Sequence, residues 1–105
     1  MSWTVIWSEF SENQLDAIYK YYCEKASSAV AEKLVTQLIL APNQLLKSQF
    51  IGQVEEQLID LETDYRYLVF KSYKLIYSVN VQKKQVKIAD VFDTRQNPVK
   101  MKRAK

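Results

Sequence analysis

The sequence predicts one α+β domain in which a strand and a helical hairpin precede a three-stranded antiparallel meander. The first observation behind this prediction is a set of three runs rich in aromatic and β-branched residues, at positions 65–71, 73–79 and 86–92. Such runs are typical of strands, and the short polar connections between them are typical of antiparallel neighbours. The second observation is that apolar residues recur at helical spacing between positions 11 and 41. The order β-α-α-β-β-β therefore predicts helices packed on one face of a small antiparallel sheet, with the first strand at its edge or in its middle.

The N-terminal part of the chain supplies the strand and the two helices. Residues 3–7 alternate between apolar and mixed positions, which predicts a short strand. Ser11, with Gln14 three positions later, has the pattern of a capping box, so we expect the first helix over residues 11–25. Ser27 and Ser28 are candidate caps for a second helix, which we expect to stop at Pro42.

The pattern between residues 42 and 64 is weaker. Val54, Leu58 and Leu61 would share one face of a short helix after Gly52. At 105 residues, 48% of them apolar, the chain suits a single domain with a core, which we expect to span residues 1–98. Residues 99–105 are expected to form a basic C-terminal tail.

Charge is distributed unevenly along the chain. Residues 65–105 hold eleven Lys or Arg against two Asp, a net charge of +9, whereas residues 1–64 hold four basic and ten acidic side chains, a net charge of −6. The net charge of +3 for the whole chain is therefore the sum of an acidic N-terminal part and a strongly basic C-terminal part. This asymmetry predicts a basic surface for an anionic partner.

The residue inventory excludes several kinds of site. The sequence has no His and a single cysteine, Cys23, so it predicts no internal disulfide, no structural zinc site and no Ser-His-Asp or Cys-His catalytic group. No metal or other cofactor is expected. No apolar run approaches the length of a membrane span, and no signal segment is evident at the N-terminus, so we expect a cytoplasmic protein without membrane contact.

Three segments together resemble the RelE/ParE superfamily of bacterial toxins. The segments are Arg66-Tyr67-Leu68-Val69, Tyr73-Lys74-Leu75-Ile76-Tyr77 and Val91-Phe92-Asp93-Thr94-Arg95-Gln96-Asn97-Pro98. The resemblance implies a toxin of a type II toxin–antitoxin module of the kind that stabilises plasmids, whose free toxin inhibits growth. It also implies a curved antiparallel sheet backed by a helical hairpin, and a cognate antitoxin as partner.

The superfamily divides by target. In the RelE branch the toxin cleaves messenger RNA on the ribosome, and the resemblance would make Arg66, Lys74 and Arg95 the catalytic residues that stabilise charge on the scissile phosphate. This sequence differs from the RelE branch in three ways. Leu68 occupies a position where RelE-branch toxins often have a second Lys, the aromatic residue near their C-terminus is missing here, and this sequence has no His. The ParE branch poisons DNA gyrase through a binding interface. We therefore favour a ParE-like toxin acting on gyrase, with a ribosome-dependent endoribonuclease as the alternative.

The predicted contact surface for the target or antitoxin is basic. Its residues are Arg66, Lys71, Lys74, Arg95, Gln96 and Lys100. We expect the first strands of the meander and the C-terminal segment to gather Arg66, Lys74 and Arg95 on a single concave surface. Structural roles remain open for these residues: Lys74 on the solvent face of a strand, and Arg95 in a salt bridge to Asp93 or Asp90. A third interpretation is a small non-toxic nucleic-acid-binding module, in which the tyrosines of the sheet stack on bases.

Overall fold

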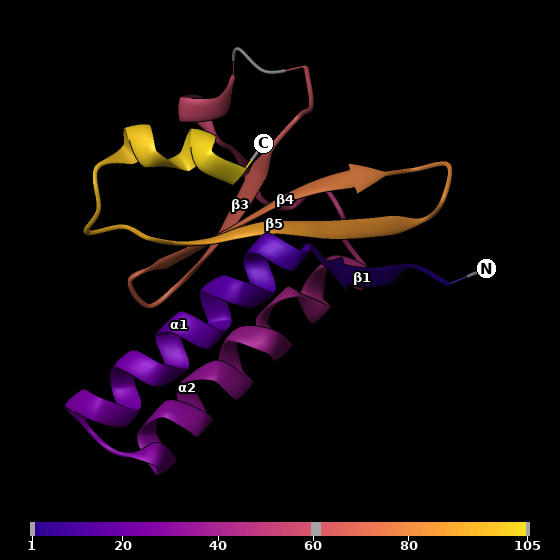
Figure 1. The fold of residues 1–105 in the computed structure, drawn as a ribbon. Coiled ribbons are helices and arrows are strands. Elements are labelled where there is room, and N and C mark those ends of the chain that lie inside the picture. The colour runs from indigo at the N-terminus through magenta and orange to yellow at the C-terminus, as the bar shows by residue number, and fades with distance from the viewer. Residues whose placement is uncertain (1, 60–61, 105) are drawn as a thin grey trace.

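A computed structural model of the chain describes residues 2–59 and 62–104 (Figure 1). Its strands are β1 (Thr4–Trp7), β2 (Gln53–Val54), β3 (Arg66–Phe70), β4 (Tyr73–Asn80) and β5 (Gln85–Asp93). Its α-helices are α1 (Glu9–Lys25) and α2 (Ser28–Leu40), and three 3₁₀ helices follow as η1 (Ala41–Leu46), η2 (Glu56–Leu58) and η3 (Pro98–Ala104). The predicted α+β class is confirmed.

The strands form one sheet in the order β1-β5-β4-β3-β2. The meander of β3, β4 and β5 is antiparallel, as the sequence predicts. The sheet as a whole is mixed, however, because β1 pairs in parallel with β5, with Val5 opposite Val86 and Trp7 opposite Ile88. The expectation of a wholly antiparallel sheet is therefore wrong at this edge. Parallel neighbours need a long connection, and the rest of the fold supplies it here.

The two faces of the sheet carry different elements (Figure 1). On one face, here called the helix face, Leu15 of α1 and Leu34 and Leu38 of α2 pack against Tyr73, Leu75 and Val91. On the opposite, outer face, Leu58 of η2 and Met101 of η3 pack against Ile76 and Phe92. Each side chain buried this fully contributes about 1.5–3 kcal/mol by leaving water.

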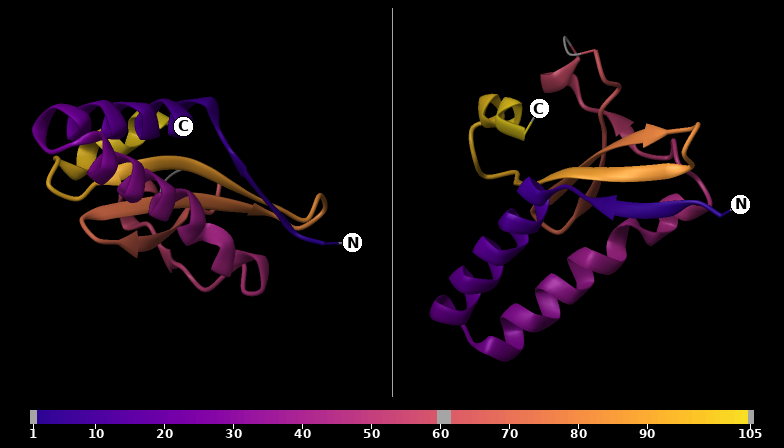
Figure 2. Two further views of the ribbon diagram at one scale, coloured as in Figure 1. Left: turned by 90° about the horizontal axis from the view of Figure 1, so that it is seen from below. Right: turned by 45° about the vertical axis from the view of Figure 1, so that its right-hand side comes forward.

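The helical hairpin forms as predicted, with one boundary shifted. The side chain of Ser8, not Ser11, caps α1 by accepting a hydrogen bond from the Ser11 amide at 3.0 Å, so the helix begins earlier than expected. Ser11 is instead buried in the first turn, where its hydroxyl donates to the Ser8 carbonyl. Ser27 caps α2 as predicted, through the Val30 amide at 3.1 Å. The two helices lie side by side and are joined at the end remote from the sheet (Figure 2).

The segment after α2 differs from the expectation. α2 ends at Leu40, and Pro42 lies in the first turn of η1, where a missing amide hydrogen costs nothing. The short helix predicted after Gly52 is wrong: the chain forms β2, paired to β3 through Gln53 and Tyr67, and then η2. Pairing with β3, and not the local sequence pattern, decides the conformation of so short a segment. Leu61, the third residue of the predicted helix face, lies outside the described residues.

The C-terminal segment carries a core residue. Residues 98–104 form η3, which lies beside η2 on the outer face (Figure 1). Met101 is 2% exposed and joins the cluster that contains Ile76 and Phe92. The segment that the sequence marks as a basic tail therefore contributes a buried side chain to the domain.

Candidate functional site

The structure places Arg66 and Lys74 on opposite faces of the sheet. Arg66 is the cross-strand partner of Tyr77, which is buried with the helix-face core. Lys74 is the partner of Val69 and lies between Tyr73 and Leu75, whose side chains occupy the helix face. Because side chains alternate along a strand, the Lys74 side chain belongs to the outer face. The prediction that Arg66, Lys74 and Arg95 share one concave surface is therefore wrong.

Arg66 supports the loop that precedes β2. Its Nη1 donates hydrogen bonds to the Gly52 carbonyl at 3.0 Å and to the Phe50 carbonyl at 3.4 Å. Its guanidinium lies 5.3 Å from the centre of the Phe50 ring, and its Nε is 3.4 Å from Asp64. These contacts use the planar fork of arginine to hold backbone carbonyls, which is a structural role.

Lys74 is held in an internal ion pair. Its Nζ is 2.9 Å from Oε1 of Glu55 and 4.2 Å from the centre of the Tyr67 ring. Glu55 is only 2% exposed, and its other oxygen accepts a hydrogen bond from the Gln57 amide at 3.1 Å. A pocket of about 240 Å³ adjoins the pair. Since the carboxylate of Glu55 already occupies the position of an anion against Lys74, a phosphate would have to displace it.

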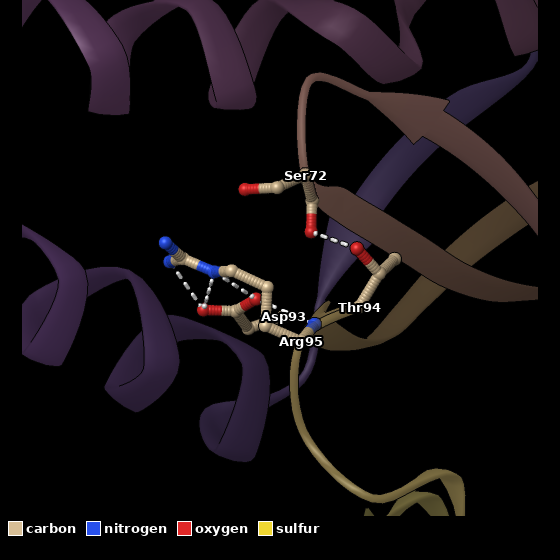
Figure 3. A network of polar contacts seen from close by, with 4 residues as sticks. All are labelled: Ser72, Asp93, Thr94 and Arg95. Carbon is tan, nitrogen blue, oxygen red and sulfur yellow. Dashed lines mark hydrogen bonds and ion pairs between the residues drawn. The ribbon is translucent and has the colours of Figure 1, made fainter.

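Arg95 is folded back onto Asp93 at the end of β5 (Figure 3). The guanidinium makes a two-point contact, with Nε 2.9 Å from Oδ1 and Nη2 2.6 Å from Oδ2 of the carboxylate. Of the two salt bridges left open for Arg95 as a structural role, to Asp93 or to Asp90, the structure shows the one to Asp93. Hydrogen bonding from Arg95 lowers the pKa of Asp93 below its ordinary value, and the same contact raises the pKa of Arg95. The geometry of the bidentate pair makes it stronger than a single contact, although the Arg95 side chain is 64% exposed.

The Asp93–Arg95 pair lies at the rim of a pocket of about 310 Å³ between α1 and the end of β5. Tyr21 and Tyr22 of α1 line it and make an edge-to-face contact, with ring centres 5.0 Å apart. Tyr73 also lines the pocket, and burial, together with a hydrogen bond to Tyr22, raises the pKa of Tyr73. Gln96 also lines this pocket, so of the predicted contact residues only Arg95 and Gln96 are brought together here.

The remaining predicted contact residues lie elsewhere. Lys71 is exposed in the two-residue turn between β3 and β4, where its φ is 52°. Lys100 is exposed on η3. Glu55 was not predicted as a site residue, because no local pattern in the sequence marks it. Tyr21 and Tyr22 were not predicted as site residues either, and the one signal for them was the pair of adjacent tyrosines in the first helix.

Within residues 2–59 and 62–104, no group of three or more acidic, Cys or His side chains is arranged to hold a metal ion. None of the helices in these ranges has the length and apolar character needed to cross a membrane.

Comparison with solved structures identifies the fold. The chromosomal ParDE toxin–antitoxin system from P. aeruginosa contains a chain that superimposes with a TM-score of 0.72 at 18% identity, over 88% of this chain and 96% of that one. Toxin RelE of E. coli, a double arginine-to-alanine mutant in the free state, superimposes with a TM-score of 0.53 at 19% identity, over 96% of this chain and 93% of that one. Both likenesses show the fold that RelE and ParE toxins share.

The sequence itself narrows the assignment further. Residues 5–98 match the profile of the ParE toxin of the type II toxin–antitoxin system parDE, and the chain belongs to this family. The predicted resemblance to the RelE/ParE superfamily, on its ParE side, is thereby confirmed. A search of curated proteins finds no match to the chain.

Proposed function

We propose that this toxin acts by binding and inhibiting an essential target, DNA gyrase, and that a cognate antitoxin neutralises it. The single observation that carries the proposal is the separation of Arg66 from Lys74 on opposite faces of the sheet. Cleavage of RNA requires cationic groups that converge on one phosphate, where they stabilise the charge of the transition state. Inhibition through a binding interface has no such requirement.

The ion pairs support the same proposal. Lys74 is bound to Glu55 and Arg95 to Asp93, so a nuclease built on these residues would first have to separate two pairs. The Lys74–Glu55 pair is largely buried, and removing one partner from a pair of that kind is costly. Each pair instead fixes a junction: β2 to β4 in one case, and the turn after β5 in the other.

The proposed contact surface for a protein partner is the pocket between α1 and β5. Tyr21 is 52% exposed there, and Arg95 and Gln96 lie beside it. Tyrosine and arginine are the side chains most often found at the energetic centres of protein interfaces. The ParDE system of P. aeruginosa pairs a toxin of this fold with an antitoxin, and we extend that pairing to this chain.

Expression of the chain alone in bacteria, followed by a supercoiling assay with purified gyrase, tests the proposal. We expect growth arrest and inhibited supercoiling. Tyr21→Ala should relieve both effects, whereas Lys20→Ala, an exposed neighbour on α1 outside the pocket, should not. Normal growth in the presence of folded protein would contradict the assignment of a toxic activity. Arrest with unaffected gyrase would contradict the proposed target, and salt-sensitive binding to nucleic acid without arrest would favour the non-toxic module.

A further inference from the structure

The hairpin formed by β4 and β5 extends past the rest of the meander. Among the described residues, β3 pairs with β4 only as far as Tyr77, so residues 78–80 have no paired strand on that side. On the other side, β1 flanks β5 as far as Gln85. The loop of residues 81–84 stands out at the edge of the molecule from which the N-terminus leaves (Figure 1). This projecting end of the hairpin, residues 78–87, is here called the hairpin tip.

The hairpin tip carries positive charge only. It contains Lys83, Lys84 and Lys87 and no acidic residue. The side chains of Lys83 and Lys87 are exposed, and within the described part of the chain neither is joined to an acid by an ion pair. Exposed lysines on a protruding element, with no acidic residue in the same segment, attract polyanions.

Hydrogen bonds hold the loop of the hairpin tip in one conformation. Oδ1 of Asn80 accepts a hydrogen bond from the Lys83 amide at 3.0 Å, and the Lys84 amide donates to the Val81 carbonyl at 3.3 Å. The Lys84 carbonyl accepts from the Thr4 amide at 3.1 Å, which ties the loop to β1. Lys84 has a φ of 53°, in the left-handed region that glycine or asparagine adopts at lower cost. The lysines therefore extend from an ordered backbone, which reduces the entropy lost on binding.

Lys87 lies on the outer face of the sheet. Val86 and Ile88 pack in the helix-face core, so the side chain between them belongs to the other face, where it lies opposite Ser78. Lys83 is four positions away in the loop, so the two Cα atoms are at most about 14 Å apart. About four nucleotides of one strand of duplex DNA span the same length along the helix axis. The two lysines are thus within reach of phosphates of a single DNA strand.

We propose that the hairpin tip binds the phosphate backbone of duplex DNA, with Lys83, Lys84 and Lys87 contacting phosphates. A two-stranded β-ribbon fits the major groove of B-form DNA. The major groove of double-stranded RNA is too deep and narrow for side chains to read. The inference goes beyond the proposed function and rests on it only for the source of the DNA, which DNA gyrase would supply.

The other side chains of the hairpin tip favour DNA over a lipid surface. Segments that bind membrane surfaces combine lysines with large apolar side chains, but in residues 78–87 only Val81 is both apolar and exposed. The polar residues around the lysines are instead the amides Asn80, Gln82 and Gln85. Amide side chains donate hydrogen bonds to phosphate oxygens and to base edges.

The test is a titration of the full chain into a fluorescein-labelled DNA duplex of about 20 base pairs, followed by fluorescence anisotropy at salt concentrations between about 50 and 200 mM. With three phosphate contacts, the affinity should fall about 40-fold over this range. Lys83→Gln/Lys87→Gln leaves one contact, so the fall should shrink to about 3.5-fold, and the affinity at the lowest salt concentration should drop at least about tenfold. Lys83→Arg/Lys87→Arg, which retains both charges, should bind as the wild type does.

Two control variants remove the same charge from other surfaces. They are Lys20→Gln/Lys25→Gln on α1 and Lys100→Gln/Lys102→Gln on η3. Both should keep the salt dependence of the wild type and change its affinity for DNA less than about threefold. Equal weakening by the hairpin-tip variant and by either control would show general attraction between charges and overturn the inference.

Three further outcomes would overturn it as well. They are no binding to the DNA duplex, equal affinity for an RNA duplex of the same sequence, and displacement of the labelled DNA by phosphatidylserine vesicles at an equal concentration of negative charge. None of these measurements involves growth arrest or supercoiling, so failure of the proposed function would be seen separately.

Discussion

The hydroxyl of Tyr77 lies in the space that a side chain at position 52 would need. A Cβ atom on Gly52 would come within 2.5 Å of that hydroxyl and 2.7 Å of the Tyr67 carbonyl, closer than real Cβ contacts. The same hydroxyl accepts a hydrogen bond from the Gly52 amide and donates one to the Gln49 carbonyl, both at 2.9 Å. The one glycine of the sequence is therefore required by this close approach of the loop to the sheet.

Replacing Gly52 should destabilise the domain. Gly52→Ala forces the buried Tyr77 ring and the Tyr67 backbone to move, at a cost of about 1–3 kcal/mol in the free energy of unfolding. Tyr77→Phe leaves the Gly52 amide and the Gln49 carbonyl without their buried partner, at a similar cost of about 1–3 kcal/mol. Urea denaturation measures both. In the double variant the clash with the hydroxyl is absent, so its cost should be less than the sum of the single costs. Strict additivity would contradict this account of Gly52.

The pair formed by Lys74 and Glu55 should behave as a coupled structural unit. Lys74→Met leaves the buried carboxylate of Glu55 without a cation, and we expect a loss of about 1–3 kcal/mol after allowing for the partial exposure of Lys74. The double variant Lys74→Met/Glu55→Leu should regain much of this loss, since it buries neither charge. A double-mutant cycle by chemical denaturation gives the coupling energy. Independent effects at the two positions would show that the pair contributes nothing.

The Asp93–Arg95 pair should make the free energy of unfolding fall as the pH becomes acidic. Arg95 lowers the pKa of Asp93 in the folded state relative to the unfolded chain. A carboxyl with a depressed folded-state pKa contributes stability above its unfolded pKa of about 3.9, and loses it as pH falls through the folded value. Thermal unfolding of the wild type should therefore weaken more steeply below pH 4 than that of Asp93→Asn, in which the titrating group is absent. Asp16→Asn, an exposed aspartate of α1, is the control that should not flatten the profile.

Met101 provides a test of how firmly the C-terminal segment is joined to the domain. Met101→Ala should cost about 2–5 kcal/mol, because the side chain is 2% exposed among Ile76, Phe92 and Leu58. Lys100→Ala, the exposed neighbour, should change the free energy of unfolding by less than about 0.5 kcal/mol. Equal, small effects of the two substitutions would show that η3 does not belong to the core.

The sequence predicted the elements that local patterns specify. The meander follows from three runs of strand-forming residues, and α2 follows from Ser27 and a continuous apolar stripe. Three features depend on contacts between distant segments and were not predicted. They are the parallel pairing of β1, the two-residue β2 and the burial of Met101. Ser8 was overlooked as the cap of α1 because no acidic or amide side chain follows it three residues later.

The error about Arg66 and Lys74 has a different origin. The two-residue turn at Lys71 and Ser72 sets the register of β3 against β4, so that Val69 lies opposite Lys74 and Arg66 opposite Tyr77. Alternation along the strand then places Arg66 and Lys74 on opposite faces. This result was available from the sequence once the length of the turn was known. The partnership of Lys74 with Glu55 was not, because 19 positions separate them and no repeat or motif connects them.

The separation of the cationic residues is tested most directly by incubating the toxin with ribosomes programmed with messenger RNA and mapping the RNA ends by primer extension. Because Arg66 and Lys74 lie on opposite faces and each is engaged by an acidic partner, we predict an uncut message at toxin concentrations that arrest growth. Cuts in the ribosomal A site that disappear in folded Lys74→Ala or Arg95→Ala protein would contradict this prediction and identify a nuclease.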